Sequence, residues 1–239
     1  MLASANAIVL TPDDTTAGKF GLKKHGDWRC AAAKQGLSEY EDIAMLIHTS
    51  GTTSKPKSVP LTHRQLGVCA TCILSTLQLG SDDVCLNMMP FYHTHSITTN
   101  LLASLFGGAA VVCAAGYPFD QQELFFKWIL DCKITWYSAV PTMHFLVVQS
   151  SSAALRTESQ KRQIKEQVRI VRSGSASLLK KTQLDLENLF GSAESPCAVI
   201  QFYATSEANP ITCNPISPLG DAHQKPGSVG KVTKAAPTC

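Results

Sequence analysis

The sequence of 239 residues contains no apolar run long enough to cross a membrane as a helix. Its N-terminus, MLASANAIVL, has no basic residue ahead of the apolar stretch, so a secretory signal peptide is not expected. Charged residues make up only 16% of the chain, the net charge is +3, and no dense Lys/Arg run is present. The sequence therefore gives no indication of nucleic acid binding or of a membrane span.

The nine cysteines do not have the spacing of a disulfide framework. They lie scattered among apolar residues and their number is odd, which fits a reducing compartment. Cys69 and Cys72 have C-x-x-C spacing, but no second pair lies at the spacing of a zinc site. We interpret these two residues as small core side chains on one helix.

Strand-like and helix-like segments alternate from Tyr40 onward, whereas residues 1–40 show no clear periodicity and are interpreted as a poorly ordered leader or linker. We predict strands over 43–48, 84–89, 109–114, 134–140, 168–172 and 198–203. We predict helices over 62–79, 101–106, 120–132, 141–148 and 178–190, with a hydrophilic loop over 150–160. The alternation predicts an α/β fold with a mostly parallel sheet and helices on both faces.

Local signals predict several helix ends. Thr62 with Gln65, and Asp120 with Glu123, have the spacing of capping boxes. Gly80 and Gly191 are predicted helix stops, and Ser175 or Ser177 is a candidate N-cap of the helix over 178–190.

Small hydroxyl residues, glycine and lysine are concentrated directly after the first predicted strand, in HTSGTTSKPKSVP at 48–60. Glycine permits a tight turn, hydroxyl and backbone N–H groups donate to phosphate oxygens, and Lys55 and Lys57 supply positive charge. The segment is not a Walker loop, because Pro56 replaces the second glycine and Pro60 interrupts the helix that should follow. The pattern predicts a phosphate-binding loop of another kind.

Three more polar clusters follow predicted strands, where parallel sheets gather their ligands: MPFYHTH at 89–95, RSGSASL at 172–178 and QFYATSE at 201–207. Each has a purely structural alternative. His93 and His95 are too few ligands for a metal site, and their structural alternative is packing within a loop. The serines could cap a helix, and Glu207 could be an exposed carboxylate at a strand end.

These clusters, with TSGTTSKPKSV before them and KPGSVGK at 225–231 after them, resemble the motifs of the adenylate-forming (AMP-binding) acyl-CoA synthetase superfamily in family order. In the loop, Ser54 and Ser58 replace family glycines. The strings IHTSGTTSKPKSVPLTH, TWYSAVPTMH and RSGSASL are most similar to the oxalyl-CoA synthetase, or peroxisomal CoA synthetase-like, branch. Pro210 stands where that branch usually has a histidine, so the resemblance does not extend to oxalate as the substrate.

The resemblance implies roles for individual residues. His93 would lie at the mouth of the carboxylate pocket, Tyr203 would stack on adenine, and Ser206 would bond the α-phosphate. Glu207 would hold Mg²⁺, which favours oxygen ligands. The catalytic set implied is Lys57, Glu207 and His93, and the remaining nucleotide-binding residues implied are Thr49, Ser50, Gly51, Thr52, Thr53, Ser54, Ser173, Gly174 and Ser175.

The family reaction implied is activation of a carboxylic acid by ATP through an acyl-adenylate, followed by thioester formation with CoA. ATP, Mg²⁺ and CoA are the implied cofactors, and a cytoplasmic or peroxisomal location is expected. The resemblance covers 41–231, expected to be part of the large N-terminal domain of the fold, with an unrelated tail at 232–239. The family's C-terminal lysine domain is not recognised, so we expect a truncated chain with impaired activity.

Two alternatives stay open. One is a catalytically inactive nucleotide-binding or interaction module, and the other is an unrelated P-loop NTPase, which Pro56 disfavours. Neither the acid nor the oligomeric state is predicted by the sequence.

Overall fold

The computed structural model describes residues 7–12, 20–25, 38–49, 57–214, 216 and 227–233. The chain divides into two units, Met1–Ser38 and Glu39–Cys239. In the first unit, β1 (Ala7–Pro12) pairs antiparallel with β2 (Phe20–His25). The sequence pattern predicted no strands there, so this hairpin is a finding of the structure.

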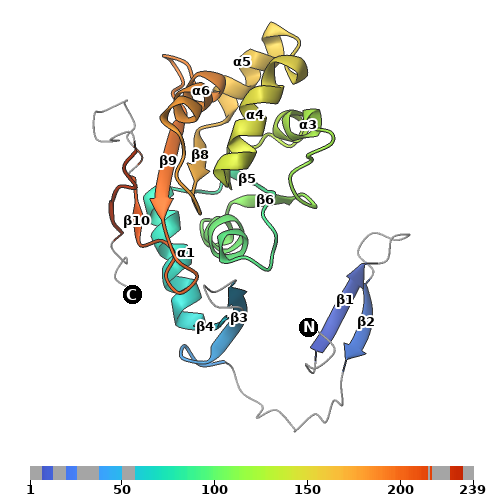
Figure 1. Cartoon of the computed structure of the whole chain (residues 1–239), viewed down its shortest axis with the longest axis vertical. Helices are drawn as coiled ribbons and strands as arrows, with labels where there is room; N and C mark the ends of the chain where they lie inside the picture. The colour runs from blue at the N-terminus through green and yellow to red at the C-terminus, as the bar shows by residue number, and fades with distance from the viewer. Residues whose placement is uncertain are drawn as a thin grey trace. The chain divides into compact units, whose positions relative to one another are not determined.

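A seven-stranded sheet forms the centre of the second unit, in the order β11-β10-β9-β8-β7-β5-β6 (Figure 1). Its parallel strands are β5 (Val84–Asn87), β6 (Ala110–Cys113), β7 (Trp136–Ala139), β8 (Ile170–Ser173) and β9 (Ala198–Tyr203). β10 (Thr212–Cys213) runs antiparallel to both β9 and β11 (Lys231–Val232). The predicted mostly parallel sheet is therefore confirmed.

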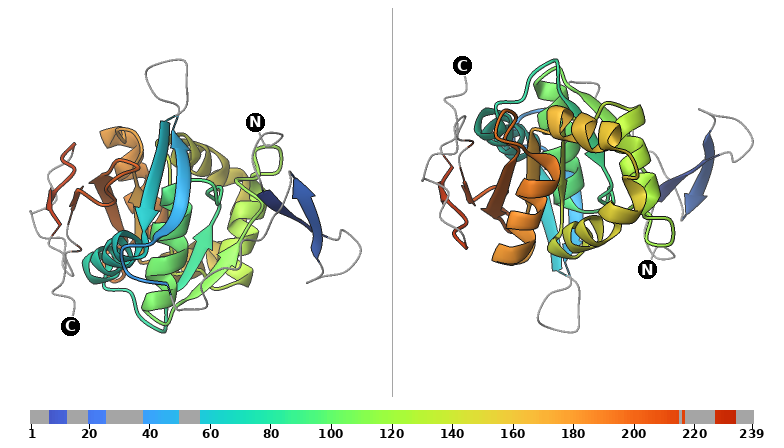
Figure 2. Two further views of the ribbon diagram at one scale, coloured as in Figure 1. Left: turned by 90° about the horizontal axis from the view of Figure 1, so that it is seen from below. Right: turned by 90° about the horizontal axis from the view of Figure 1, so that it is seen from above.

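Helices cover both faces of this sheet, as predicted (Figure 2). One face packs against α3 (Glu123–Asp131), α4 (Pro141–Ala154), α5 (Glu158–Gln167) and α6 (Lys180–Phe190). The other packs against α1 (His63–Leu77), the π-helix η2 (His95–Leu102) and α2 (Ala103–Phe106). Successive residues of a strand point to opposite faces. Tyr137 and Val171 thus join the first core cluster, whereas Trp136 and Ile170 join the second.

The strand predicted at 43–48 does not belong to the parallel sheet. β3 (Ile43–Thr49) pairs antiparallel with β4 (Lys57–Thr62) in a separate two-stranded sheet. Ile47, Val59 and Leu61 form its small core. The interpretation that the phosphate loop follows a strand of the parallel sheet is wrong, because residues 50–56 connect the two strands of a hairpin.

α1 begins where the sequence predicts. Thr62 Oγ1 accepts the backbone N–H of Gln65 at 3.2 Å, and the Gln65 side chain accepts the backbone N–H of Thr62 at 2.8 Å. The helix ends at Leu77, and its C-cap Gln78 takes the left-handed conformation with φ of 46° and closes the last turn. The predicted stop at Gly80 therefore lies beyond the observed end. Gly191, by contrast, is the C-cap of α6, as predicted.

Two predicted caps are wrong. Gln122 rather than Asp120 precedes α3, and its side chain makes no capping hydrogen bond. Leu179 precedes α6, so neither Ser175 nor Ser177 caps that helix. Buried Phe125 and Phe126 pack the first turn of α3 into the core, and Gln183 in the first turn of α6 accepts a hydrogen bond from Gln201 Nε2 at 3.0 Å.

Two predicted boundaries also change. The loop expected at 150–160 is instead the end of α4 and the start of α5, where Thr157 and Gln160 form a capping box. The helix expected at 101–106 begins earlier, because η2 starts at His95 and continues into α2. Both missed helical stretches are rich in polar residues, so they lack the apolar periodicity that predicts a helix.

Arg169 and Asp83 join three elements at the amino edge of the sheet. Arg169 Nε and Nη2 contact the two carboxylate oxygens of Asp83 at 2.7 and 2.5 Å, and Nη2 donates to the Gln78 carbonyl at 3.1 Å. Asp83 also accepts the Gly80 N–H at 2.9 Å and the Thr135 hydroxyl at 2.8 Å. Burial raises the pKa of Asp83, but these hydrogen bonds outweigh it and hold that pKa below its usual range.

His144 is fully buried between α4 and the sheet, with Nδ1 3.3 Å from the Tyr137 hydroxyl. Burial lowers the pKa of His144 from 6.5 to about 4, so the ring is neutral in the folded protein at neutral pH. As the pH falls below 6.5, His144 becomes protonated in the unfolded chain but stays neutral in the folded chain. The contribution of His144 to stability is therefore lost between about pH 6.5 and 4, and it amounts to roughly 3 kcal/mol at most.

We expect His144→Gln to flatten this part of the pH dependence. Urea unfolding at pH 7 and pH 4.5 measures it for the wild type and the variant. His63→Gln is the control, because His63 lies exposed at the start of α1. Equal loss of stability in His144→Gln and the wild type would contradict the assignment.

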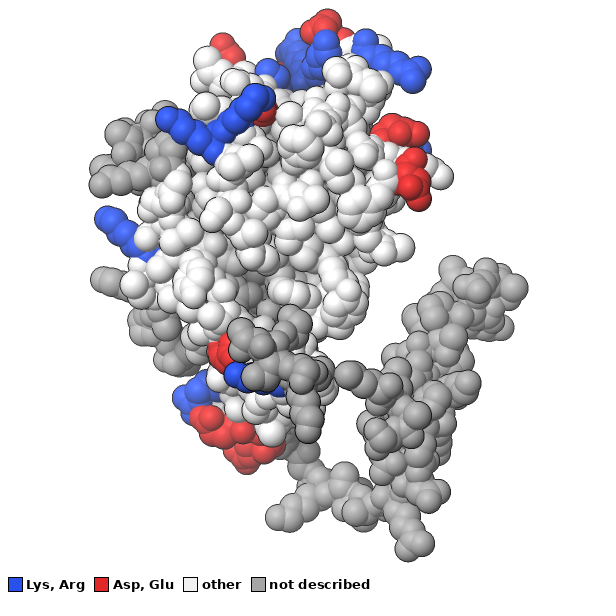
Figure 3. Space-filling model, in the orientation of Figure 1, with Lys and Arg blue, Asp and Glu red and all other residues white. Residues whose placement is uncertain are grey.

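Among the described residues, no helix is long and apolar enough to span a membrane. On the face shown in Figure 3, the Lys and Arg side chains lie in separate groups with a wide uncharged surface between them. Cys69 and Cys72 lie on α1 without a disulfide, Cys69 half-buried and Cys72 buried. In the described part of the chain, no three His, Cys, Asp or Glu residues are arranged to hold a metal ion.

Candidate active site

The carboxyl ends of β5, β7, β8 and β9 lie at one edge of the sheet, because these strands are parallel and adjacent (Figure 1). Ala139 is the register partner of Ser173, and Ser173 is the partner of Gln201. The three predicted polar clusters leave the sheet at this edge. The structure thus places together segments that lie far apart in the sequence.

His95 rather than His93 points into the molecule. His95 is buried, its Nε2 lies 2.6 Å from Ser138 Oγ, and its ring meets the Phe202 ring edge-on at a centroid distance of 5.4 Å. His93 is half-buried, and its Nδ1 accepts the His95 backbone N–H at 3.1 Å. Burial lowers the pKa of both rings, that of His95 well below its usual range, so both are neutral at neutral pH.

Asn87 orients this histidine segment from the end of β5. It is fully buried, and its Oδ1 accepts from Asn100 Nδ2 at 2.8 Å, Ser96 Oγ at 3.1 Å and the Met89 N–H at 3.2 Å. These bonds fix the chain from the strand end into η2. Sequence reasoning missed Asn87, although a polar residue ending an apolar strand is a signal for such a role.

Gly174 is required by a close approach between neighbouring strands. A Cβ at Gly174 would lie 2.0 Å from the Phe202 ring, far inside van der Waals contact. Glycine at this position therefore leaves room for the Phe202 ring. Of the predicted residues beside it, Ser173 is buried with no partner for Oγ, and Ser175 is exposed with φ of 68°.

Arg172 is a fully buried cation directly before the Ser173–Ser175 segment. Its guanidinium carbon lies 3.3 Å from the centroid of the Phe202 ring, and Nη1 donates to Thr99 Oγ1 at 3.2 Å. Burial lowers the pKa of Arg172 to about 10 while the Cys213 thiol raises it, so the side chain stays charged at neutral pH. Sequence reasoning missed Arg172, although an arginine within an apolar strand is an available signal.

The end of β9 and the turn after it present polar side chains to solvent. Tyr203 is 52% exposed and Glu207 is exposed, whereas Ser206 is half-buried. The Thr205 N–H donates to the Ala208 carbonyl at 2.9 Å, which closes a turn around Ser206 and Glu207. Asn209 Nδ2 donates to Thr98 Oγ1 at 2.7 Å and so ties this turn to η2.

Only the two ends of the phosphate loop are described. Thr49 and Lys57 are register partners where the β3–β4 hairpin opens, and Lys57 is exposed. Ser58 Oγ, which replaces a family glycine, lies 3.4 Å from His48 Nε2 across the hairpin. The remaining predicted loop residues, Ser50, Gly51, Thr52, Thr53 and Ser54, lie outside the described residues.

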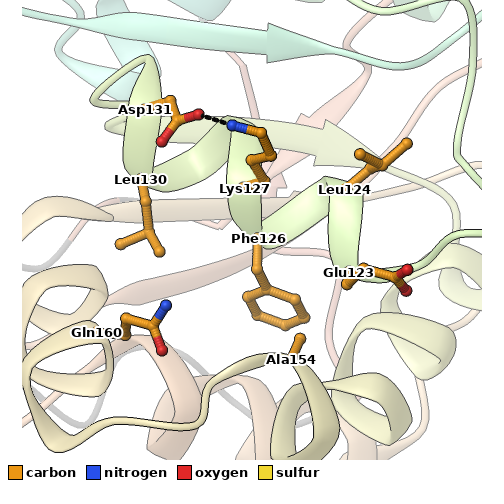
Figure 4. Close-up of a pocket in the computed structure, with 8 residues that line it drawn as sticks. All are labelled: Glu123, Leu124, Phe126, Lys127, Leu130, Asp131, Ala154 and Gln160. Atoms are coloured by element: carbon orange, nitrogen blue, oxygen red, sulfur yellow. Dashed lines mark hydrogen bonds and ion pairs between the residues drawn. The ribbon is translucent and has the colours of Figure 1, made fainter.

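A surface hollow of about 280 Å³ lies elsewhere, among α3, α4 and α5 (Figure 4). Lys127 and Asp131 form an ion pair on its wall. It contains no predicted site residue; its lining is Glu123, Leu124, Phe126, Lys127, Leu130, Asp131, Ala154 and Gln160. The predicted site residues His93, Ser173–Ser175, Tyr203, Ser206 and Glu207 lie at the strand ends instead.

Comparison with known proteins decides the family. The profile of the AMP-binding enzymes matches residues 5–237. The chain belongs to the AMP-binding enzyme family. The match extends on both sides of 41–231, the range over which the motifs carry the resemblance. This family assignment was predicted from the motifs and is confirmed.

Curated relatives of the chain include CoA ligases. The chain is 36% identical over 200 residues to a probable CoA ligase, CCL9, of Humulus lupulus. It is 35% identical over 201 residues to an oxalate–CoA ligase of Arabidopsis thaliana. Each alignment covers 84% of this chain and 36% of the relative, so the chain spans about a third of their length.

Solved structures of this family share the fold. ATP-bound MatB from Rhodopseudomonas palustris superposes with a TM-score of 0.67 at 26% identity, over 82% of this chain and 35% of that one. The fold is thus part of the adenylate-forming fold, as predicted.

Proposed function

We propose that this chain contributes to ATP-dependent activation of a carboxylic acid. The acid carboxylate attacks the α-phosphorus of ATP, which forms an acyl-adenylate and releases pyrophosphate. The CoA thiolate then displaces AMP to give the thioester. The main support is the strand-end edge, where the family motifs of an AMP-binding enzyme meet with Tyr203 and Glu207 open to solvent.

The proposal gives a role to residues of the strand-end edge and of the β3–β4 hairpin. Tyr203 stacks on the adenine ring, and Ser206 donates to the α-phosphate. Lys57, with the loop of residues 50–56 before it, neutralises the departing pyrophosphate. His93, half-buried and neutral, lies at the entrance for the acid. The segment Ser173–Ser175 forms the wall between the adenine and the acid.

The donor set fits Mg²⁺ carried in by the nucleotide. Magnesium commonly binds one or two protein carboxylates together with substrate phosphates and waters. Glu207 is an exposed carboxylate at the strand-end edge and fits this pattern without further acidic residues beside it. The ion, when bound, would neutralise charge on the phosphate oxygens. The buried thiols of Cys85, Cys197 and Cys213, which form no disulfide, fit a reducing, cytoplasmic or peroxisomal location.

Pyrophosphate release from ATP and Mg²⁺, with and without a panel of short carboxylic acids, tests this function. We expect acid-dependent release that falls at least tenfold in Glu207→Gln. Glu194→Gln is the matched control, because Glu194 is exposed in the loop before β9, away from the strand-end edge. ATP binding without pyrophosphate release would instead identify an inactive nucleotide-binding module. Absence of nucleotide binding would contradict both functions.

A further inference from the structure

Strand β6 is an open edge of the seven-stranded sheet (Figure 1). It pairs with β5 on one side, and no strand in the described part of the chain pairs with its other side. The Ala110 N–H donates to the carbonyl of Asp83, directly before β5, at 2.9 Å. Because alternate residues of a strand direct their backbone groups to opposite sides, the N–H and C=O groups of Val111 and Cys113 face away from β5.

The β6 edge lacks the features that usually prevent an edge strand from pairing with another chain, which are charged side chains, proline and bulges. Other strands of this protein have them. β11, at the opposite end of the same sheet, begins with Lys231, and β4, in the two-stranded sheet, contains Lys57 and Pro60. β6 has the sequence AVVC and a regular register with β5, so its outward backbone groups are left unprotected.

The sequence around β6 is uncharged and partly exposed. No Asp, Glu, Lys or Arg lies between Asp83 and Asp120, a stretch that includes η2, α2 and β6. Within it, Leu105 and Phe106 before β6 and Phe119 after it are 54%, 53% and 56% exposed. Exposed apolar side chains on both sides of an open strand indicate a contact surface for another protein. A second copy brings no like charge to this surface, whereas a strongly charged partner finds no opposite charge there.

The backbone of this edge is complementary to itself. Two antiparallel strands can be related by a two-fold axis, which is the commonest symmetry of protein dimers. With the axis at Val112, Val111 of one copy stands opposite Cys113 of the other, and the two residues exchange their outward N–H and C=O groups. The same pairing repeats on the other side of the axis, so a second copy provides partners for the outward backbone groups of β6.

We propose that two copies of this chain associate through their β6 edges and form one continuous sheet across a two-fold axis. Burying the exposed halves of Leu105, Phe106 and Phe119 in both copies removes roughly 600 Å² of surface from water. A specific interface buries about 1,000 Å² or more, and the paired strands add to the side-chain area. The dimer therefore lies at the lower limit of a specific interface, with a dissociation constant in the micromolar range. The association does not depend on the function proposed above.

Sedimentation velocity of the 239-residue chain under reducing conditions, from about 1 to 100 μM, tests this proposal. We expect a reversible monomer–dimer equilibrium that added salt does not weaken, because no charge pair contributes to it. Cys113→Lys places like charges near the axis and should raise the dissociation constant at least tenfold. Cys132→Lys is the matched control and should leave it unchanged, because Cys132 is also exposed but lies directly after α3.

Val111→Pro is a second variant that should weaken the dimer, because it removes an outward N–H and leaves the hydrogen bonds between β6 and β5 in place. Val111→Thr, which keeps the N–H and a similar shape, should dimerise like the wild type. Circular dichroism shows whether each variant is folded, and Cys113→Lys decides alone if Val111→Pro is not. A monomer at every concentration, a mass that continues to rise beyond the dimer, or a dimer that the folded variants leave unchanged would overturn the proposal.

Discussion

Replacing Gly174 with alanine is expected to destabilise the fold by about 1–3 kcal/mol, the usual cost of overpacking a core. The new methyl group would lie 2.0 Å from the Phe202 ring, so the ring or strand β8 must move. Phe202 also contacts His95 and Arg172, which means that the displacement reaches the whole strand-end edge. Urea unfolding monitored by circular dichroism measures the loss.

Gly67→Ala is the matched control for this prediction. Gly67 lies within α1, and a Cβ there would meet no atom within 4 Å. Alanine favours the helix interior over glycine, so this variant should be stabilised by about 0.5–1 kcal/mol. Phe202→Leu combined with Gly174→Ala should recover part of the lost stability, because the two residues are in contact. If the two single glycine variants have equal stability, the close approach is wrong.

Replacing Arg169 should lower the free energy of unfolding at least as much as Gly174→Ala does, although Arg169 is remote from the strand-end edge. Arg169→Met leaves the Asp83 carboxylate, 7% exposed as a side chain, without its cation. Stranding a buried charge costs about 3–5 kcal/mol, and the partial exposure of Arg169 reduces this to roughly 2–4 kcal/mol. Urea unfolding at pH 7, where Asp83 is ionised, provides the measurement.

Two further variants test whether the loss of stability in Arg169→Met comes from the stranded Asp83 charge or simply from the loss of a basic side chain. Lys181→Met breaks the exposed Lys181–Asp185 pair on α6 and should change the free energy of unfolding by less than about 1 kcal/mol. Asp83→Asn with Arg169→Met should be more stable than Arg169→Met alone, since no charge is then stranded. A double variant as unstable as the single one would refute this explanation.

Much of the fold could be predicted because the parallel strands are buried on both faces and are therefore nearly continuous apolar runs. The strand predicted at 198–203 coincides with β9, and the capping box at Thr62 marks the start of α1. The motif TSGTTSKPKSV, followed in family order by the polar clusters after β5, β8 and β9, indicated the family, which the profile match then confirmed.

The remaining errors concern features that tertiary contacts decide. β3 has the composition of a core strand, and only its pairing with β4 places it in a hairpin. α5 buries only Ile164, so its polar sequence indicated a loop. The π-helix η2 begins with polar residues that Asn87 satisfies from another element. The inward direction of His95 and Arg172 likewise depends on packing against Phe202, which no local pattern reports.

Titration calorimetry with a non-hydrolysable acyl-adenylate analogue tests the central claim, that the strand-end edge holds an acyl-adenylate, without depending on turnover. We predict saturable binding at one site, weakened at least fivefold in Tyr203→Ala, because base stacking on an aromatic ring is worth about 1–3 kcal/mol. Tyr40→Ala is the control, since Tyr40 is 73% exposed and lies outside the polar clusters. No binding by the wild type, or equal affinity of Tyr203→Ala and the wild type, would contradict the claim.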